Sequence, residues 1–346
     1  TKTPITKTPI IEIPLTKTHP SPRHPSPRHT HHQDIHHQDT HPADTASTKE
    51  FKEEAVVRGG LLAAEAGDAE ASEELLNRAL KFSDTSPWKA LAQVGAMFNA
   101  FAREDYERVV ALYNLGAYTP PDESRAKMLL IVAHSYRLMN NLEPALRLYT
   151  LVEAKYPRQK EGVEAGYRRI QLLHQTSDKA LPDVADNYAR TQTAIDASNP
   201  YIDMAWLMKA EYHFVQAETA ASGAGSDYAS KHYALAAAAY TKVRLEMVDT
   251  KYHEMCLYKR GWSQIESDNF KNGIVNLTRF IQKHRKSSLA SSAIAKRASA
   301  YQHNEDYQLA LEDFRDIAKN YPEAPELEFA LQQIALIYAH QRKTTE

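Results

Sequence analysis

The sequence predicts an all-α protein, in which short helical hairpins follow a low-complexity tail. After about residue 48, apolar residues recur at the three- and four-residue spacing of an amphipathic helix, without an alternating strand pattern. Breaks rich in Gly, Pro and Asn interrupt this pattern at intervals of roughly 15 to 20 residues. The chain has 346 residues, of which 42% are hydrophobic, so it can bury the core of a long array or of two average domains.

Residues 1–48 differ in composition from the rest of the chain. They contain short tandem duplications, TKTPI-TKTPI, HPSPR-HPSPR and HHQDI-HHQDT, and Thr, Pro and His dominate. Frequent prolines forbid a regular helix, and the few apolar side chains cannot offset the entropy lost on folding. We therefore expect a disordered tail over residues 1–48 and a helical domain over residues 49–346.

This tail holds eight of the sixteen histidines: His19, His24, His29, His31, His32, His36, His37 and His41. Imidazole binds zinc, copper and nickel, but nothing in the tail fixes the geometry of the ligands. We interpret the tail as a linker that binds such metals loosely. A metal-binding protein that acts through the tail is kept as an alternative function.

The helical part is divided by residues that favour turns. These breaks lie at Gly67-Asp68, Pro120-Pro121, Asn140-Asn141, Pro157, Asn199-Pro200, Gly223–Gly225, Asp268-Asn269 and Pro322. Short helices separated by short turns, without a sheet, indicate antiparallel helical hairpins.

Two stretches of 34 residues, 126–159 and 291–324, share a pattern. A small residue stands at the eighth and twentieth places, an aromatic residue at the eleventh and twenty-fourth, and Tyr-Pro at the end of each unit. These residues are Ala133, Tyr136, Ala145, Tyr149 and Pro157 in the first unit, and Ala298, Tyr301, Ala310, Phe314 and Pro322 in the second. Small residues let two helices approach closely, and Pro ends the second helix.

This pattern resembles that of the tetratricopeptide repeat family, whose unit is about 34 residues long. Residues 254–290 match less fully, with Gly261 and Leu277 at the small and aromatic places. Residues 53–87, 88–121 and 203–253 match loosely, and the last needs an insertion, which we assign to an extended turn at 222–227. The resemblance covers about seven helix pairs, and the poor match at 160–202 leaves open a split into two lobes there.

The resemblance implies a right-handed superhelical array, an α-solenoid whose concave face is lined by the first helix of each pair. It assigns partner binding on that face to Lys127, His134, Arg137, Glu211, Phe214, Met255, Tyr258, Trp262, Gln302 and His303. The alternative for Tyr258 and Trp262 is packing between neighbouring hairpins, and that for His134 and His303 is a structural or solvated role. Because no unit shows the Lys and Asn of a carboxylate clamp, we expect a groove for an apolar or aromatic-anchored peptide or helix.

Signatures of other functions are absent from the sequence. It has no G-x-S-x-G, P-loop, G-x-G-x-x-G, H-E-x-x-H or C-x-x-C motif, so we expect neither an enzyme nor a bound cofactor. The single cysteine, Cys256, is interpreted as a buried apolar residue, and the helical part has no His pair at i,i+4 spacing to hold a metal. A net charge of −2 and the absence of a long apolar run favour neither nucleic acid nor a membrane span.

The predicted function is a non-catalytic scaffold that binds another protein or peptide, without a small-molecule substrate. The Tyr-Pro unit ends and the Gly261-Trp262 pair resemble bacterial envelope repeat proteins that serve outer-membrane assembly, the Tol–Pal division system and motility complexes. This favours the periplasm or envelope of a Gram-negative bacterium over the cytoplasm. Residue 1 is Thr, so we expect an upstream segment, and a targeting module of a larger enzyme is a further alternative.

Overall fold

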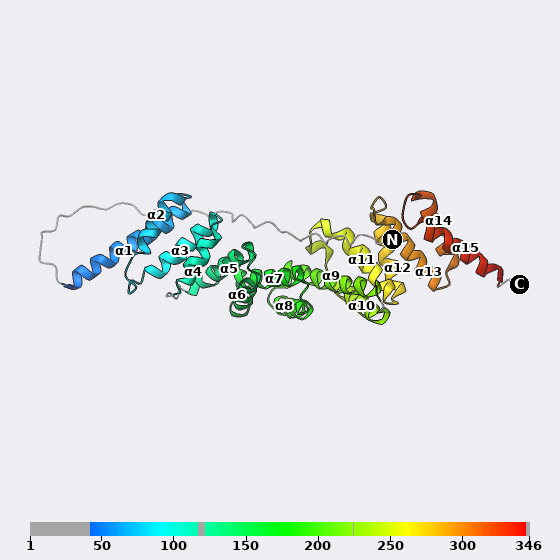
Figure 1. Cartoon of the computed structure of the whole chain (residues 1–346), viewed down its shortest axis with the longest axis horizontal. Helices are drawn as coiled ribbons and strands as arrows, with labels where there is room; N and C mark the ends of the chain where they lie inside the picture. The colour runs from blue at the N-terminus through cyan, green and yellow to red at the C-terminus, as the bar shows by residue number, and fades with distance from the viewer. Residues whose placement is uncertain (1–41, 117–121, 224, 344–346) are drawn as a thin grey trace. The chain divides into compact units, whose positions relative to one another are not determined.

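The computed structural model describes residues 42–116, 122–223 and 225–343, and within these ranges it contains helices and no strand (Figure 1). This confirms the predicted all-α fold. The predictions for the tail before Pro42, including its histidines, and for the Pro120-Pro121 break concern residues outside the described ranges. The helices are α1 (Pro42–Glu65), α2 (Ala69–Ala79), α3 (Lys89–Ala102), α4 (Tyr106–Asn114), α5 (Asp122–Leu138), α6 (Leu142–Lys155), α7 (Lys160–Gln175), α8 (Leu181–Ile195), α9 (Tyr201–Ala221), α10 (Ser226–Lys242), η1 (Leu245–Met247), η2 (Thr250–Tyr252), α11 (His253–Glu266), α12 (Phe270–Lys283), α13 (Ala290–His303), α14 (Tyr307–Asn320) and α15 (Leu327–Lys343).

The chain divides into two compact units, residues 1–139 with α1–α5 and residues 140–346 with α6–α15. We call them unit 1 and unit 2. The division falls at the Asn140-Asn141 turn and not within residues 160–202, where the sequence left a split open. In unit 2, α7 and α8 form a hairpin, and α7 also contacts α6 and α9, so this segment is continuous with both neighbours.

One backbone turn recurs after the first helix of successive pairs. The second residue after the helix end has a positive φ, and the next helix begins two residues later. The residues and their φ angles are Gly67 (83°), Glu104 (61°), Asn140 (61°), Asp268 (61°) and Glu305 (64°). Because Gly, Asn and Asp tolerate this left-handed conformation best, three of these turns could be predicted from sequence. The turns at Glu104 and Glu305 could not be predicted in this way, because Glu does not favour the left-handed conformation.

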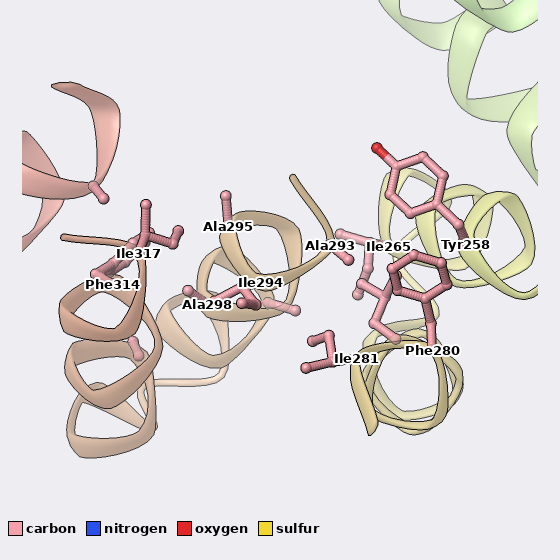
Figure 2. Close-up of a cluster of buried hydrophobic side chains, with 14 of the residues drawn as sticks. Tyr258, Ile265, Phe280, Ile281, Ala293, Ile294, Ala295, Ala298, Phe314 and Ile317 are labelled. Carbon is pink, nitrogen blue, oxygen red and sulfur yellow. The ribbon is translucent and has the colours of Figure 1, made fainter. Parts of the chain in front are cut away.

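Small and aromatic residues fill the core of unit 2 as the repeat pattern predicts. In α13 and α14, the side chains of Ala298, Ala310 and Phe314 are fully buried. In α11, a Cβ added to Gly261 would lie 2.7 Å from Leu277 of α12, which shows how closely this hairpin packs. Figure 2 shows the continuous apolar cluster that these hairpins share, from Tyr258 and Phe280 to Ile317.

The insertion expected within residues 203–253 has a different form from the prediction. An extended turn at 222–227 is wrong, because α9 ends at Ala221 and α10 begins at Ser226. The extra residues lengthen the helices instead: α9 has 21 residues and α10 has 17, whereas α11 and α12 have 14 each. The added turns bury Ala217, Ala229 and Tyr233, so the longer hairpin is stabilised by its own apolar contacts.

Helix α1 begins at Pro42, inside the segment predicted to be a tail up to residue 48. Pro is well tolerated in the first turn of a helix, where its missing N–H has no helical acceptor. The following residues, ADTASTKE, contain neither Pro nor Gly, so nothing in them stops the helix from beginning there. The low-complexity composition of residues 1–48 gave no indication that a helix begins at Pro42.

Candidate partner-binding face

The first helices of three consecutive pairs in unit 2, α9, α11 and α13, contact one another in sequence. Phe214, Trp262 and Lys296, one from each helix, form a continuous row that we call the Trp262 row. The Trp262 ring meets Phe214 edge-on with centroids 4.9 Å apart, and Lys296 Nζ lies 3.9 Å from the indole centroid. An edge-on aromatic pair and a cation over a ring face are both favourable, so the half-buried indole is held in place from two sides.

The charged groups along the Trp262 row are paired within the chain. Lys259 Nζ lies 2.6 Å from Glu211 and 4.6 Å from the centre of the Phe214 ring. Lys296 Nζ lies 2.9 Å from Glu266, which also accepts a hydrogen bond from Trp262 Nε1 at 3.1 Å. The two lysines are therefore neutralised by neighbouring carboxylates and do not present an uncompensated positive charge.

Glu211 is the centre of a buried polar network between α9, α10 and α11. Its side chain is 1% exposed and accepts hydrogen bonds from the Tyr240 hydroxyl and from Lys259. Burial, together with the nearby Glu211 carboxylate, raises the pKa of Tyr240 well above its usual value, so the phenol stays a donor. A buried carboxylate with two donors locks the three helices together.

The structure separates the predicted contact residues by burial. His134, Glu211, Phe214 and Tyr258 are buried and face this chain's own side chains. Arg137, Met255, Trp262 and Gln302 are half-buried, and Lys127 and His303 are exposed. His134, Arg137 and Lys127 belong to unit 1 and the others to unit 2. Whether any of them binds a partner stays a prediction.

The buried positions have clear packing roles. The Tyr258 hydroxyl lies 2.8 Å from Ser292 Oγ of α13, and its ring packs 5.5 Å from that of Phe280. Tyr258 therefore packs between neighbouring hairpins, which was the alternative interpretation of this residue. The exposed His303 stacks on Phe270 at the start of α12, with ring centroids 4.1 Å apart.

Sequence reasoning missed Lys296, which belongs to the row, and Lys259, which lies beside Phe214. A signal was present for Lys296, because Trp262 and Lys296 are 34 residues apart, as are Tyr258 and Ser292. Residues at the same place of consecutive repeats meet where their first helices pack. Comparing each candidate with the residue one repeat later would have found both contacts.

Unit 1 has a separate hollow of about 400 Å³ between α3, α4 and α5. Val94, Met97 and Met128 supply apolar wall, and the Gln93 amide group donates to the Leu112 carbonyl at 2.5 Å. The hollow therefore has both polar and apolar walls, and the Gln93 Oε1 atom in its lining is a buried acceptor without a donor.

Residues 255–287 and 293–324 match the family model described as tetratricopeptide repeat. These two segments are tetratricopeptide repeats. The matched segments correspond to the predicted units 254–290 and 291–324, which hold α11–α14 and carry most of the Trp262 row. Tetratricopeptide repeats are in general non-catalytic modules of protein–protein interaction. None of the described helices is long and apolar enough to cross a membrane.

Several solved structures are similar to this chain. A tetratricopeptide repeat protein from Parabacteroides merdae is 12% identical, with a TM-score of 0.39 over 83% of this chain and 99% of that chain. The TPR2AB domain of yeast Sti1, solved in complex with pHSP90, is 14% identical, with a TM-score of 0.34 over 84% and 99% of the two chains. A Rap protein complexed with competence and sporulation factor is 10% identical, with a TM-score of 0.30 over 87% and 99%. No curated protein matches the sequence.

Proposed function

We propose that this protein is a non-catalytic scaffold that binds a peptide or helix of another protein across α9, α11 and α13. The Trp262 row carries the proposal. A half-buried Trp that is already fixed between an aromatic ring and a lysine loses little side-chain entropy when a partner packs on it. Aromatic anchors of this kind contribute much of the binding energy in protein interfaces.

The internal pairing of charges indicates the chemistry of the partner. A clamp for a C-terminal carboxylate needs cations that are available to the ligand. Lys259 and Lys296 are each held by a carboxylate of this chain, at 2.6 and 2.9 Å. We therefore infer a partner that packs an apolar or aromatic side chain against the Trp262 row and makes polar contacts around it.

Pull-down from the source cell with the full chain tests this proposal. Trp262→Ala removes the anchor, and Lys296→Met removes the cation that holds it. Val275→Ala is the matched control, because Val275 is an exposed apolar residue of α12, 44% accessible, and has no part in the row. Each variant is first checked for unchanged helicity by circular dichroism.

A partner that binds the parent and Val275→Ala, and is lost from Trp262→Ala, supports the proposal. We expect Lys296→Met to weaken capture as well, since the indole is then held from one side only. If all four proteins retain the same partner equally, the Trp262 row is not the binding site. We also propose a Gram-negative envelope as the compartment of this partner, because the Tyr-Pro unit ends and the Gly261-Trp262 pair resemble envelope repeat proteins. Cell fractionation with an antibody against this chain would check the compartment.

A further inference from the structure

Two histidines of the long hairpin meet side by side in unit 2. His213 lies on α9 and His232 on α10, nineteen residues apart, and their Nδ1 atoms are separated by 3.2 Å. The ring planes are inclined by 57° with centroids 5.2 Å apart, so the rings are tilted and not stacked. Histidine spacing within one helix does not reveal this pair, because it forms across a hairpin.

The separation of the two nitrogens suits a shared metal ion. Zinc–imidazole bonds are about 2.0–2.1 Å long, so two nitrogens 3.2 Å apart subtend an angle of about 100° at one ion. That angle is close to the tetrahedral value. The distance between the two nitrogens therefore already matches that of a pair bound to one ion.

The two Nδ1 atoms lie at hydrogen-bonding distance, so one ring donates a proton toward the other. An ion bound by both nitrogens takes the place of this proton, which moves to Nε2 of the same ring.

The surroundings leave one side of the pair open. His213 is 6% exposed, whereas His232 is half-buried, and its ring centroid lies 4.2 Å from that of the exposed Tyr228. Lys209 is the nearest cation to His213 on the same helix, and its charge is offset by Asp186 at a distance of 2.6 Å. Water can therefore reach an ion held by the two imidazoles.

We propose that His213 and His232 form a two-histidine site for a divalent zinc, nickel or copper ion, with water completing the coordination. Imidazole ligands suit all three metals, and copper is expected to bind most tightly. Among the described residues no group of three or more His, Cys, Asp or Glu could hold a metal, so two protein ligands and open positions define the site. This site is independent of the Trp262 row.

Copper binding tests the site, provided that the tail histidines do not compete. The parent for this experiment is the full chain with its eight tail histidines changed to Asn. One equivalent of Cu²⁺ is added, the electron paramagnetic resonance spectrum is recorded, and the affinity is measured by titration calorimetry. His232→Gln removes one ligand, His213→Gln the other, and His340→Gln, at an exposed residue of α15, is the control.

We expect the parent and the control to show the splitting from two nitrogens and to bind one equivalent. His232→Gln should bind roughly tenfold more weakly or worse, with the two-nitrogen pattern lost. Zn²⁺ should raise the melting temperature of the parent but not of either ligand variant. The proposal is overturned if His232→Gln, shown by circular dichroism to be folded, keeps the affinity and spectrum of the parent. It is equally overturned if the parent binds no tighter than the two ligand variants.

Discussion

Replacing Gly162 with Ala is expected to disrupt the junction between α6 and α7. Gly162 lies in the first turn of α7, against the chain that leaves α6. A Cβ at this position would lie 1.9 Å from the Tyr156 carbonyl oxygen and 3.2 Å from the Pro157 nitrogen. Both are main-chain atoms, so no side-chain rotation relieves the contact, and the connection between the helices must move.

The expected cost follows from two opposing effects. Overpacking a close contact costs about 1–3 kcal/mol, and the upper half of this range applies because backbone must shift. Ala stabilises a helix interior by up to about 1 kcal/mol relative to Gly, and by less in the first turn. The net loss is therefore about 2 kcal/mol, which corresponds to roughly 30-fold more frequent opening of α7.

Hydrogen–deuterium exchange of the full chain measures this opening locally, in peptides that cover α7 (Lys160–Gln175). Gly223→Ala is the control, because its Cβ would meet only the Ala220 carbonyl oxygen at 3.7 Å. We expect α7 amides to exchange roughly 30-fold faster in Gly162→Ala and at the parent rate in Gly223→Ala. Exchange of α7 within about twofold of the parent would show that the close approach at Gly162 does not exist.

Three further predictions concern buried groups of unit 2. Asp203→Asn should lower the free energy of unfolding by about 2 kcal/mol in a denaturant titration, since the fully buried carboxylate accepts bonds from the backbone nitrogen and guanidinium of Arg244 at 2.6–3.1 Å. The exposed pair of Glu143 and Arg147 is its control, and Glu143→Gln should change that free energy by less than about 0.5 kcal/mol. Burial raises the pKa of Cys256 to about 12, so a thiol reagent at pH 8 should label the native chain roughly 100-fold more slowly than the unfolded chain, and equal rates would contradict the burial. Burial lowers the pKa of His213 to about 4, so below pH 6.5 the unfolded chain binds a proton at this residue that the folded chain does not bind. The melting temperature should therefore fall as the pH drops from 6.5 to 4, and it should fall less steeply in His213→Gln.

The sequence predicted the helices and most of their ends because these depend on local chemistry. Asn140 and Asp268 occupy left-handed turn positions for which their side chains are suited, and Pro157 and Pro322 follow helix ends. Glu104 and Glu305 occupy the same turn position without a local signal. In those cases the surrounding helix packing must impose the conformation.

The candidate site was harder to predict because it depends on contacts between repeats. Places taken from the family pattern identify the helix face, but not which side chains are covered by the next helix. Phe214 is covered by Trp262, and Tyr258 by α13, so both are buried. The His213–His232 pair forms across the α9–α10 hairpin, nineteen residues apart, and the 34-residue pattern does not describe the pairing of polar residues within a hairpin.

The paired charges of the Trp262 row lead to a last prediction, which rests on the proposed function. Because Lys259 and Lys296 are neutralised by Glu211 and Glu266, an apolar partner gains little from long-range attraction. Its dissociation constant should change by less than about threefold between 0.05 and 0.5 M NaCl, a range over which exposed charges are strongly screened.

Glu266→Gln provides the matched perturbation, because it leaves Lys296 without its carboxylate while the indole stays in place. For an acidic partner peptide, this variant should bind more tightly than the parent at low salt and should lose that advantage at high salt. A parent complex that already weakens steeply with salt would mean that charges outside the row carry the binding, and the aromatic anchor would then be the wrong explanation.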